Sequence, residues 1–160
     1  MPYQDIFDSK VYQLSETVSD KAWAVVMAWP EFAREAFGKQ FVAAADSIGA
    51  NIAESAGRYY PLDGIRFLHY SRGSVRETQH CIKRAFTRKL VSAEWYQEVG
   101  AVLKEILFSL NAYIKFQRTR KVTTPSKQVK DGTTIYEVGP IEDIPDDNDT
   151  DSIPWPASDH

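Results

Sequence analysis

Small side chains recur at helical spacing on both sides of one turn, in and around the segment from Ser47 to Glu77. Residues spaced by three or four positions predict two α-helices, at about residues 39–57 and 61–89. The first stripe contains Phe41, Ala45, Ile48, Ile52 and Ala56, and the second contains Phe67, Ser71, Ser74, Thr78, Cys81 and Ala85. Because small residues let two helix backbones approach closely, we expect a tight antiparallel hairpin across a turn at Arg58–Pro61.

Glycine and proline set the expected details of this hairpin. Gly57 stands where a residue in the left-handed conformation would end the first helix, and Pro61 suits the first position of the second. Gly49 lies inside the first helix, where glycine costs about 1 kcal/mol relative to alanine. We therefore expect a neighbouring element to pack closely against Gly49.

Two further helices are predicted, at residues 7–29 and at about residues 92–118. Pro30 ends the first of them, residues 31–37 form a connector with room for one helical turn, and the Ser92 hydroxyl suits the N-cap of the last helix. Their inner faces are expected to carry Val11, Leu14, Val18, Ala22, Val25 and Trp29 in the first, and Val99, Leu103, Ile106, Leu110 and Tyr113 in the last. Four helices with short links predict an all-α protein, an up-down-up-down antiparallel four-helix bundle.

Charge is distributed unevenly along the chain. Residues 1–120 carry 16 Lys and Arg against 13 Asp and Glu, whereas residues 121–160 carry 3 against 9. The second segment also contains five prolines and an acidic cluster at 146–151. We interpret residues 1–120 as the bundle domain and residues 121–160 as an acidic, flexible and disordered tail. Such a tail is either a solubilising segment or a short partner-binding motif.

Composition excludes several classes of protein. Cys81 is the single cysteine, so the chain forms no internal disulfide and no multi-cysteine metal site. No apolar run approaches the roughly 20 residues of a membrane span, and the first residues lack the unbroken apolar segment of a signal peptide. We expect a cytoplasmic protein with no membrane partner.

Polar side chains form one stripe on the first helix of the hairpin, at spacings of 4, 3 and 4. With Glu77 across the turn, we interpret this stripe as a hydrogen-bond network that fixes the hairpin or joins subunits. The residues of this predicted network are Ser47, Asn51, Glu54, Arg58 and Glu77. A catalytic role for the two glutamates is the alternative, but no nucleophile or second acid in a cleft accompanies them.

The sequence predicts no catalytic residue, no metal site and no cofactor. His69 and His80 are the histidines of the hairpin, and they stand 11 residues apart on one predicted helix. That separation corresponds to about 16 Å along the helix axis, which is too far for the two side chains to share a metal ion.

Positive charge accumulates along the second helix of the hairpin. From Arg58 to Lys89, eight Lys and Arg residues face only Asp63 and Glu77, a local balance of +6. Such a stripe attracts phosphates through charge and counterion release, and the guanidinium group matches phosphate oxygens. The alternative is an ordinary solvated helix face. The predicted nucleic-acid-binding residues are Arg66, Arg72, Arg76, Lys83, Arg84, Arg88 and Lys89.

Two blocks of residues in the hairpin resemble the signature of a known family. The first block, S-I-x-x-N-I-A-E-x-x-G-R, comprises Ser47, Ile48, Asn51, Ile52, Ala53, Glu54, Gly57 and Arg58. The second block, R-F-L-x-x-x-x-G-S-x-x-E, comprises Arg66, Phe67, Leu68, Gly73, Ser74 and Glu77. Over about residues 7–118 the chain is similar to the small four helix bundle protein family. That family includes proteins encoded in intervening sequences of large-subunit ribosomal RNA genes and is related to the accessory variability determinant of diversity-generating retroelements.

The resemblance implies a bundle assembled as a barrel-like homopentamer with a basic surface. In the retroelement branch, such a pentamer binds a reverse transcriptase and nucleic acid and supports mutagenic complementary-DNA synthesis. The resemblance implies no catalytic residue. This chain departs from the common pattern at Gly49 and Ala50, where a proline or a bulkier residue is frequent, and in its acidic tail. The branch of the family therefore stays open.

Two hypotheses about function follow. The first is a non-enzymatic, oligomeric accessory protein that binds RNA or DNA and partners a reverse transcriptase. The second is a protein–protein interaction scaffold with no nucleic-acid role, in which the last helix makes the oligomer and the tail recruits a partner. An oligomer fits both, because Val102, Leu107, Phe108 and Ile114 lie partly outside the inner stripe of the last helix. A helix that is apolar on more than one face needs more than one partner.

Overall fold

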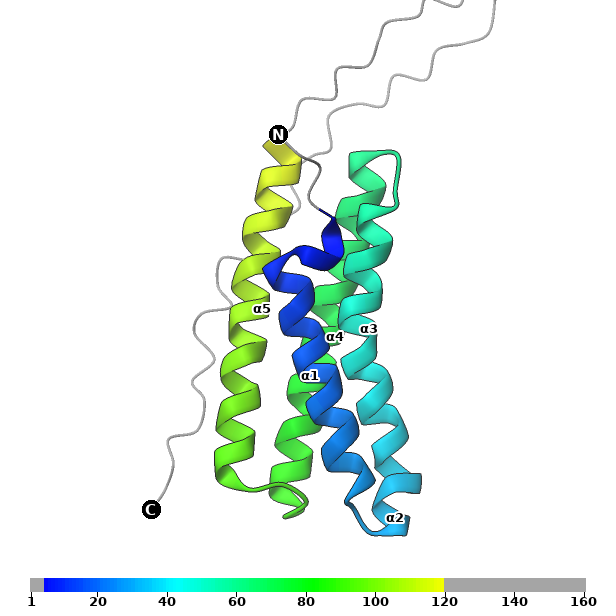
Figure 1. Cartoon of the computed structure of the whole chain (residues 1–160), viewed down its shortest axis with the longest axis vertical. Helices are drawn as coiled ribbons and strands as arrows, with labels where there is room; N and C mark the ends of the chain where they lie inside the picture. Colours follow the sequence, from blue (N-terminus) through cyan, green and yellow to red (C-terminus); the bar gives the residue numbers. More distant parts are fainter. Residues whose placement is uncertain (1–4, 120–160) are drawn as a thin grey trace, which may run out of the picture. The chain divides into compact units, whose positions relative to one another are not determined.

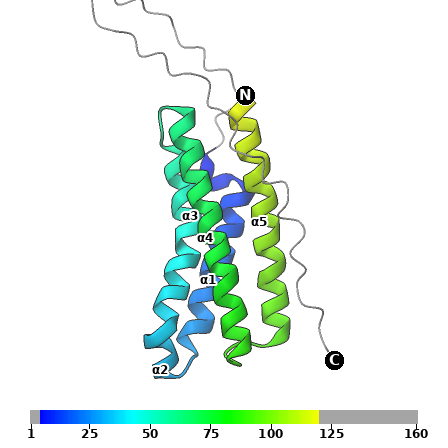
Figure 2. The same cartoon turned by 180° about the vertical axis from the view of Figure 1, so that it is seen from behind.

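The computed structural model describes residues 5–119, and every regular element in that range is helical. Four long helices, α1, α3, α4 and α5, run alternately up and down around one core (Figures 1 and 2). The elements in chain order are η1 (Ile6–Asp8), α1 (Lys10–Met27), α2 (Glu31–Ala33), η2 (Arg34–Gly38), α3 (Lys39–Ala56), α4 (Pro61–Thr87) and α5 (Ala93–Thr119). The predicted all-α, up-down four-helix bundle is confirmed. The predicted tail, residues 121–160, lies outside the described residues.

The four helices form a square in cross-section. Contacts join α1 to α3, α3 to α4, α4 to α5 and α5 to α1. No contact joins α1 to α4, which overlap in both views because one lies behind the other (Figures 1 and 2). The outward faces of α1 and α4 therefore point to opposite sides of the bundle, so each can present a different chemistry to solvent.

The connector predicted at residues 31–37 contains more than the one helical turn expected there, because helical structure runs without a break from Glu31 to Ala56. Pro30 ends the preceding helix as expected, but the chain turns back into helix at the next residue. The change of direction is followed by the π-helical turn η2, in which the Lys39 N–H donates to the Arg34 carbonyl five residues earlier. A π turn accommodates one extra residue. Phe37 within η2 and Phe41 in α3 are both buried, and their rings stack on each other and on the Trp29 ring.

The closest packing in the bundle is between α3 and α4, as the small stripes predict. Ser71, Thr78, Cys81 and Ala85 of the predicted α4 stripe are buried. The Ser71 hydroxyl donates a buried hydrogen bond of 2.9 Å across the seam to the carbonyl of Ile48. At the turn, a Cβ placed on Gly64 would lie only 2.9 Å from the Ser55 carbonyl oxygen.

Close packing against Gly49 is also present, but the neighbour is α1 rather than α4. A Cβ on Gly49 would lie 2.8 Å from the Ser15 hydroxyl oxygen. The inner face of α1 is shifted from the predicted one, with Ser15 against Gly49 and Val26 against Gly38. Ser15 and Val26 are buried, whereas the predicted Leu14 and Val25 are only half-buried. On α5, Ile114 similarly replaces the predicted Tyr113 in the core.

The left-handed residue predicted at Gly57 is found instead at the end of α4. Gly57 has φ −76° and ψ −7°, an ordinary right-handed helical conformation. Lys89 has φ 57°, and it is the only residue of positive φ within residues 5–119. The Lys89 N–H donates to the Phe86 carbonyl, and the Leu90 N–H donates to the Ala85 carbonyl, both at 2.9 Å. These two bonds form a Schellman motif, in which glycine is the usual left-handed residue.

Two glycines of α4 offer a matched test of the seam. No atom lies within 4 Å of a Cβ placed on Gly73, apart from the nearby backbone of its own helix. We expect Gly73→Ala to raise the free energy of unfolding by about 1 kcal/mol, because alanine is the better helix former. Gly64→Ala should lower it by about 1–3 kcal/mol, because the added methyl group would press on the Ser55 backbone. Urea unfolding followed by circular dichroism measures both changes, and equal effects at the two sites would contradict the close approach of α3 and α4.

The left-handed Lys89 predicts a second stability change. We expect Lys89→Gly to raise the free energy of unfolding by about 0.5–1 kcal/mol, because glycine carries no Cβ penalty at positive φ. Lys89→Ala is the control, since it removes the charge and keeps the penalty. Thermal unfolding of both variants separates the two contributions. A Lys89→Ala protein as stable as Lys89→Gly would assign the gain to charge instead of backbone geometry.

Candidate functional site

The seven predicted nucleic-acid-binding residues lie along α4 and its C-terminal end. We call them the α4 cations. Arg72, Arg76 and Arg84 are half-buried, and the other four are exposed. The core-facing side of α4 is occupied by small and apolar residues, which leaves the charged groups on the outward side of the helix.

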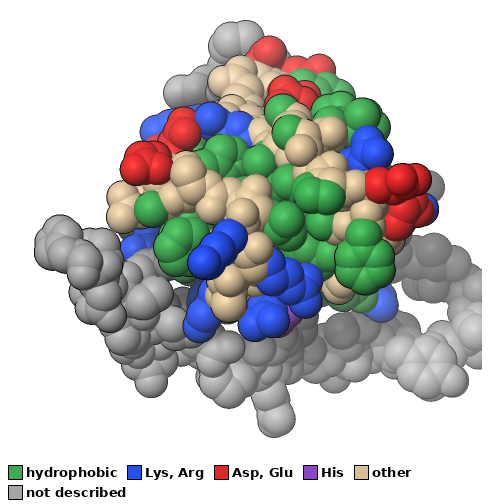
Figure 3. Space-filling view, turned by 90° about the horizontal axis from the view of Figure 1, so that it is seen from below, with side chains coloured by type: hydrophobic (Ala, Val, Ile, Leu, Met, Phe, Trp, Pro, Cys, Tyr) green, Lys and Arg blue, Asp and Glu red, His purple; other side chains and the backbone are tan. Residues whose placement is uncertain are grey.

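Lys and Arg side chains gather on one side of the bundle end that Figure 3 shows, with a histidine among them. Both described histidines, His69 and His80, belong to α4, and the seven α4 cations lie along the same helix and its C-terminal end. The Asp and Glu side chains visible in the same view lie on other sides of the bundle. On those sides Lys and Arg side chains lie beside Asp and Glu, whereas the cluster has no acidic side chain next to it in this view.

The α4 cations lack the acidic partners that four other cations of the bundle have. Lys10 pairs with Glu105 and Lys21 pairs with Glu98, both between α1 and α5. Lys39 pairs with Glu35, and Arg58 pairs with Glu54. Within residues 5–119, none of the seven α4 cations forms such a pair. Their charge is therefore not neutralised by the described part of the chain.

Neutral groups hold three of these cations in place. The Arg66 Nε donates to the Tyr70 hydroxyl at 2.6 Å, and the Arg76 Nη1 donates to the Gln79 Oε1 at 3.1 Å. The Arg88 guanidinium lies 4.7 Å from the centre of the Phe37 ring. These contacts position the side chains and leave their positive charge uncompensated.

Arg118 on α5 adds to the positive field beside α4, and the sequence reasoning missed it. Burial lowers the pKa of His69, and the charges of Arg72 and Arg118 lower it further. The His69 Nε2 is buried and has no hydrogen-bond partner in the described part of the chain. His69 therefore stays neutral at neutral pH and contributes no charge. The sequence gives no local sign that Arg118 acts on His69, because only the packing of α5 against α4 brings the two side chains near each other.

The predicted polar network divides into two parts. Ser47 and Asn51 bond within their own helix: the Ser47 hydroxyl donates to the Ala43 carbonyl at 2.7 Å, and the Asn51 amide donates to the Ser47 carbonyl at 2.8 Å. These two side chains are half-buried on α3 and do not reach α4 through hydrogen bonds in the described residues. Their place in a subunit interface stays a prediction.

The other members of the network do connect α3 with α4. Arg58 pairs with Glu54, and its guanidinium lies 4.3 Å from the centre of the Phe67 ring on α4. Glu77 accepts a hydrogen bond of 3.4 Å from Gln40 of α3. The buried bond from Ser71 is the better-protected link across the seam. Sequence reasoning placed Ser71 on the inner face but not in the network.

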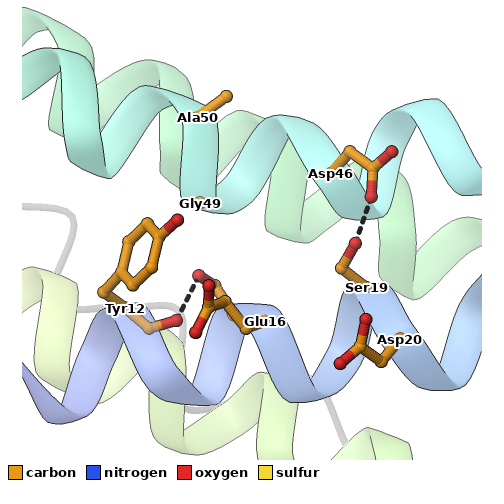
Figure 4. A pocket seen from close by; sticks show the side chains of 8 residues that line it. Tyr12, Glu16, Ser19, Asp20, Asp46, Gly49 and Ala50 are labelled. Atoms are coloured by element: carbon orange, nitrogen blue, oxygen red, sulfur yellow. Dashed lines mark hydrogen bonds between the residues drawn. The ribbon is translucent and has the colours of Figure 1, made fainter. Parts of the chain in front are cut away.

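A hollow of about 450 Å³ opens between α1 and α3 (Figure 4). Its lining carries three carboxylates and no lysine or arginine. The lining residues are Tyr12, Ser15, Glu16, Ser19, Asp20, Asp46, Gly49 and Ala50. The Ser19 hydroxyl donates to Asp46 across the hollow, as Figure 4 shows. No set of His, Cys, Asp or Glu within residues 5–119 is arranged to hold a metal ion.

The remaining chemical groups favour packing over reaction. Cys81 is buried, and burial raises the pKa of its thiol to about 11. The thiol is therefore protonated at neutral pH, whereas a cysteine nucleophile reacts as the thiolate. None of the described helices is both long and apolar enough to cross a membrane.

Comparisons with known proteins support the fold and identify a family. No curated protein matches the chain. A crystal structure of a protein of unknown function from the S23 ribosomal protein family of Bacteroides thetaiotaomicron is similar, with a TM-score of 0.59 and 22% sequence identity. The match covers 66% of this chain and 98% of that one, and at this identity it supports the fold alone.

The model of the 23S rRNA-intervening sequence protein family matches residues 7–112. This range contains both sequence blocks of the hairpin and most of α5. It confirms the family resemblance that the two blocks carry. Because the match spans more than half of the sequence, the chain belongs to the 23S rRNA-intervening sequence protein family.

Proposed function

We propose that this protein is a non-enzymatic, oligomeric accessory protein that binds RNA or DNA through the outward face of α4. The observation that carries the proposal is the absence of acidic partners for the seven α4 cations within residues 5–119. Elsewhere in the bundle, at Lys10, Lys21, Lys39 and Arg58, the surface cation has a carboxylate beside it. Arg34, Lys115 and Arg118 have no such salt bridge among the described residues either, so the distinguishing feature of α4 is that seven unpaired cations lie along one helix.

The dimensions of the α4 face suit a polyanion. Arg66 and Lys89 are 23 residues apart, which corresponds to about 35 Å along a helix. A nucleic-acid backbone offers phosphates along the whole of such a length, and each neutralised phosphate releases condensed counterions. The family description, which refers to an intervening sequence in 23S rRNA, is compatible with an RNA ligand.

Charge on the opposite side of the bundle supports one binding orientation. Glu16, Asp20 and Asp46 line the hollow between α1 and α3, and α1 lies diagonally across the bundle from α4. A negative face repels phosphates and a positive face attracts them, so the field of the protein directs a nucleic acid to α4.

The outer face of α5 supports self-association. Phe108 is 77% exposed and Phe116 is 58% exposed. Large apolar side chains gathered on a surface mark interaction sites more often than they serve a free monomer. We propose that this face joins copies of the chain. The resemblance described above makes a homopentamer the expected assembly and a reverse transcriptase an expected partner.

A protein–protein scaffold with no nucleic-acid role is the second candidate function. The exposed phenylalanines of α5, together with Phe32 on α2 at 84% exposure, favour it. In this alternative the tail recruits a partner, and the α4 cations are only a solvated face. Nucleic-acid binding by the purified protein separates the two functions.

Charge reversal tests the α4 face. We expect the triple variant Arg72→Glu, Arg76→Glu and Lys83→Glu to bind RNA on the order of 100-fold more weakly at low salt, with a log–log salt slope reduced by about three. Reversal of Lys10, Lys21 and Lys39 to Glu is the control, because it changes the net charge equally at paired sites on other faces. Fluorescence anisotropy titrations at several salt concentrations measure both variants. An equal loss of RNA affinity in the two variants would show that only the net charge of the protein matters. An α4 variant that binds RNA as the wild type does would refute the proposed site.

Introduction of charge on α5 tests the assembly. We expect Phe108→Glu to reduce the mass measured by light scattering to that of a monomer, because a carboxylate would be desolvated in the interface. Phe32→Glu is the control, since it changes an equally exposed ring on a different element. A wild-type protein that is already monomeric would refute self-association, and an unchanged mass for Phe108→Glu would exclude this face.

A further inference from the structure

Two tyrosines in the turn between α3 and α4 are exposed without contributing to the core. Tyr59 is 89% exposed, the highest value among the large apolar side chains of residues 5–119, and Tyr60 is 61% exposed. Their rings contact each other edge to face, with centroids 5.0 Å apart and an interplanar angle of 89°. Aromatic side chains usually stabilise a fold by burying a large area. These two rings leave most of that area open to a ligand.

The backbone that carries the two rings is held in place. The Tyr60 carbonyl accepts hydrogen bonds from the N–H groups of Asp63 and Gly64, at 3.1 and 3.2 Å. Pro61 follows as the first residue of α4, and Gly64 packs against the Ser55 carbonyl. The tyrosines therefore project from a turn that is tied to the ends of both helices.

Guanidinium groups and further rings lie next to this turn in the sequence, at Arg58 and along the first turns of α4. The Arg58 guanidinium lies 4.3 Å from the centre of the Phe67 ring, and the Arg66 guanidinium lies 5.6 Å from that of the exposed Tyr70. The Phe67 and Tyr70 rings are themselves 5.6 Å apart. Rings and cations thus alternate at this end of α4, and Arg66 is the first of the α4 cations.

We propose that this end of the bundle binds unpaired bases of single-stranded nucleic acid, which stack on Tyr59 and Tyr60. Arg66 and the following α4 cations hold the phosphates of the same strand. The proposal rests on the nucleic-acid-binding function proposed above and adds the form of the ligand. Every base has a π face, so stacking on an aromatic ring tolerates any sequence. Bases in a duplex are already stacked on one another, and their faces are closed to the tyrosines.

The charge around the turn distinguishes a nucleic acid from an apolar protein partner. Tyrosine and arginine are also frequent at protein interfaces, so the discriminating feature is the excess of positive charge beside the rings. From Tyr59 to Arg76, three arginines, Arg66, Arg72 and Arg76, face a single acid, Asp63. Aromatic rings beside a positive groove are the combination that binds single strands without sequence preference.

The test compares three oligonucleotides of equal length with the full chain. They are an unstructured single strand, the same strand with abasic sites throughout its centre, and the blunt duplex. The abasic strand keeps every phosphate and lacks the bases, so it reports charge without stacking. We expect the wild-type protein to bind the normal strand at least 10-fold more tightly than the abasic strand at the same salt concentration, since stacking contributes about 5- to 150-fold per base.

Substitutions then assign the stacking to the turn. We expect Tyr59→Ala with Tyr60→Ala to bind the normal strand on the order of 25-fold more weakly and the abasic strand as the wild type does. Tyr59→Phe with Tyr60→Phe should keep wild-type affinity, because the rings remain. Trp23→Ala with Phe32→Ala is the matched control, since it removes two exposed rings from other helices. All four side chains changed here are exposed, so thermal unfolding should stay at the wild-type midpoint.

The outcomes separate this inference from the function on which it rests. If the alanine variant binds the normal strand as well as the wild type does, or loses equal affinity for the abasic strand, the stacking site is refuted. If the α4 charge reversal still weakens binding in that case, nucleic-acid binding stands without it. A wild-type protein that binds none of the three oligonucleotides refutes both proposals.

Discussion

The contact between α3 and α4 is the constraint on which the rest of the structure depends. The helices approach closely because serine, alanine and glycine occupy their facing sides, and the Ser71 hydroxyl spans the seam to the Ile48 carbonyl. The inner side of α4 is filled by these small residues and by apolar side chains such as Leu68 and Ile82, and it holds no charged side chain. The arginines and lysines of α4 are therefore on its outer side. The seam that stabilises the hairpin also determines where the positive charge is displayed.

Charge segregation then follows from how the four helices are connected. Cations on α1 meet acids on α5, so these two helices neutralise each other along their shared edge. The acids left over on α1 and α3 line the hollow, on the side of the bundle away from α4. A chain of modest net charge can in this way carry one strongly positive face. The attraction of a polyanionic ligand depends more on where the charges lie on the surface than on the net charge of the protein.

The sequence predicts most of the fold and only part of the site, for identifiable reasons. Helical period, the prolines and the Ser92 N-cap have local causes, and the four long helices are found where these signals place them. The rotation of α1 was missed because Ser15 is polar and only its contact with Gly49 explains its burial. The left-handed Lys89 was missed because glycine is the usual signal for that conformation. The α4 cations are visible in the sequence, but their lack of acidic partners and the influence of Arg118 on His69 depend on tertiary packing.

A single hydrogen bond makes the two ends of the bundle unlike. The Trp29 indole donates to the Leu90 carbonyl at 2.9 Å, which joins the corner after α1 to the corner between α4 and α5 across 61 residues of sequence. Stacked rings of Phe37 and Phe41 support the same end. The backbone bonds of the α3–α4 turn, in contrast, are all local. Insertions or substitutions at that turn would leave the Trp29–Leu90 hydrogen bond at the other end of the bundle intact. The end with Trp29 and Leu90 thus holds the helices together, whereas the α3–α4 turn at the other end can change in sequence and accommodate a new ligand.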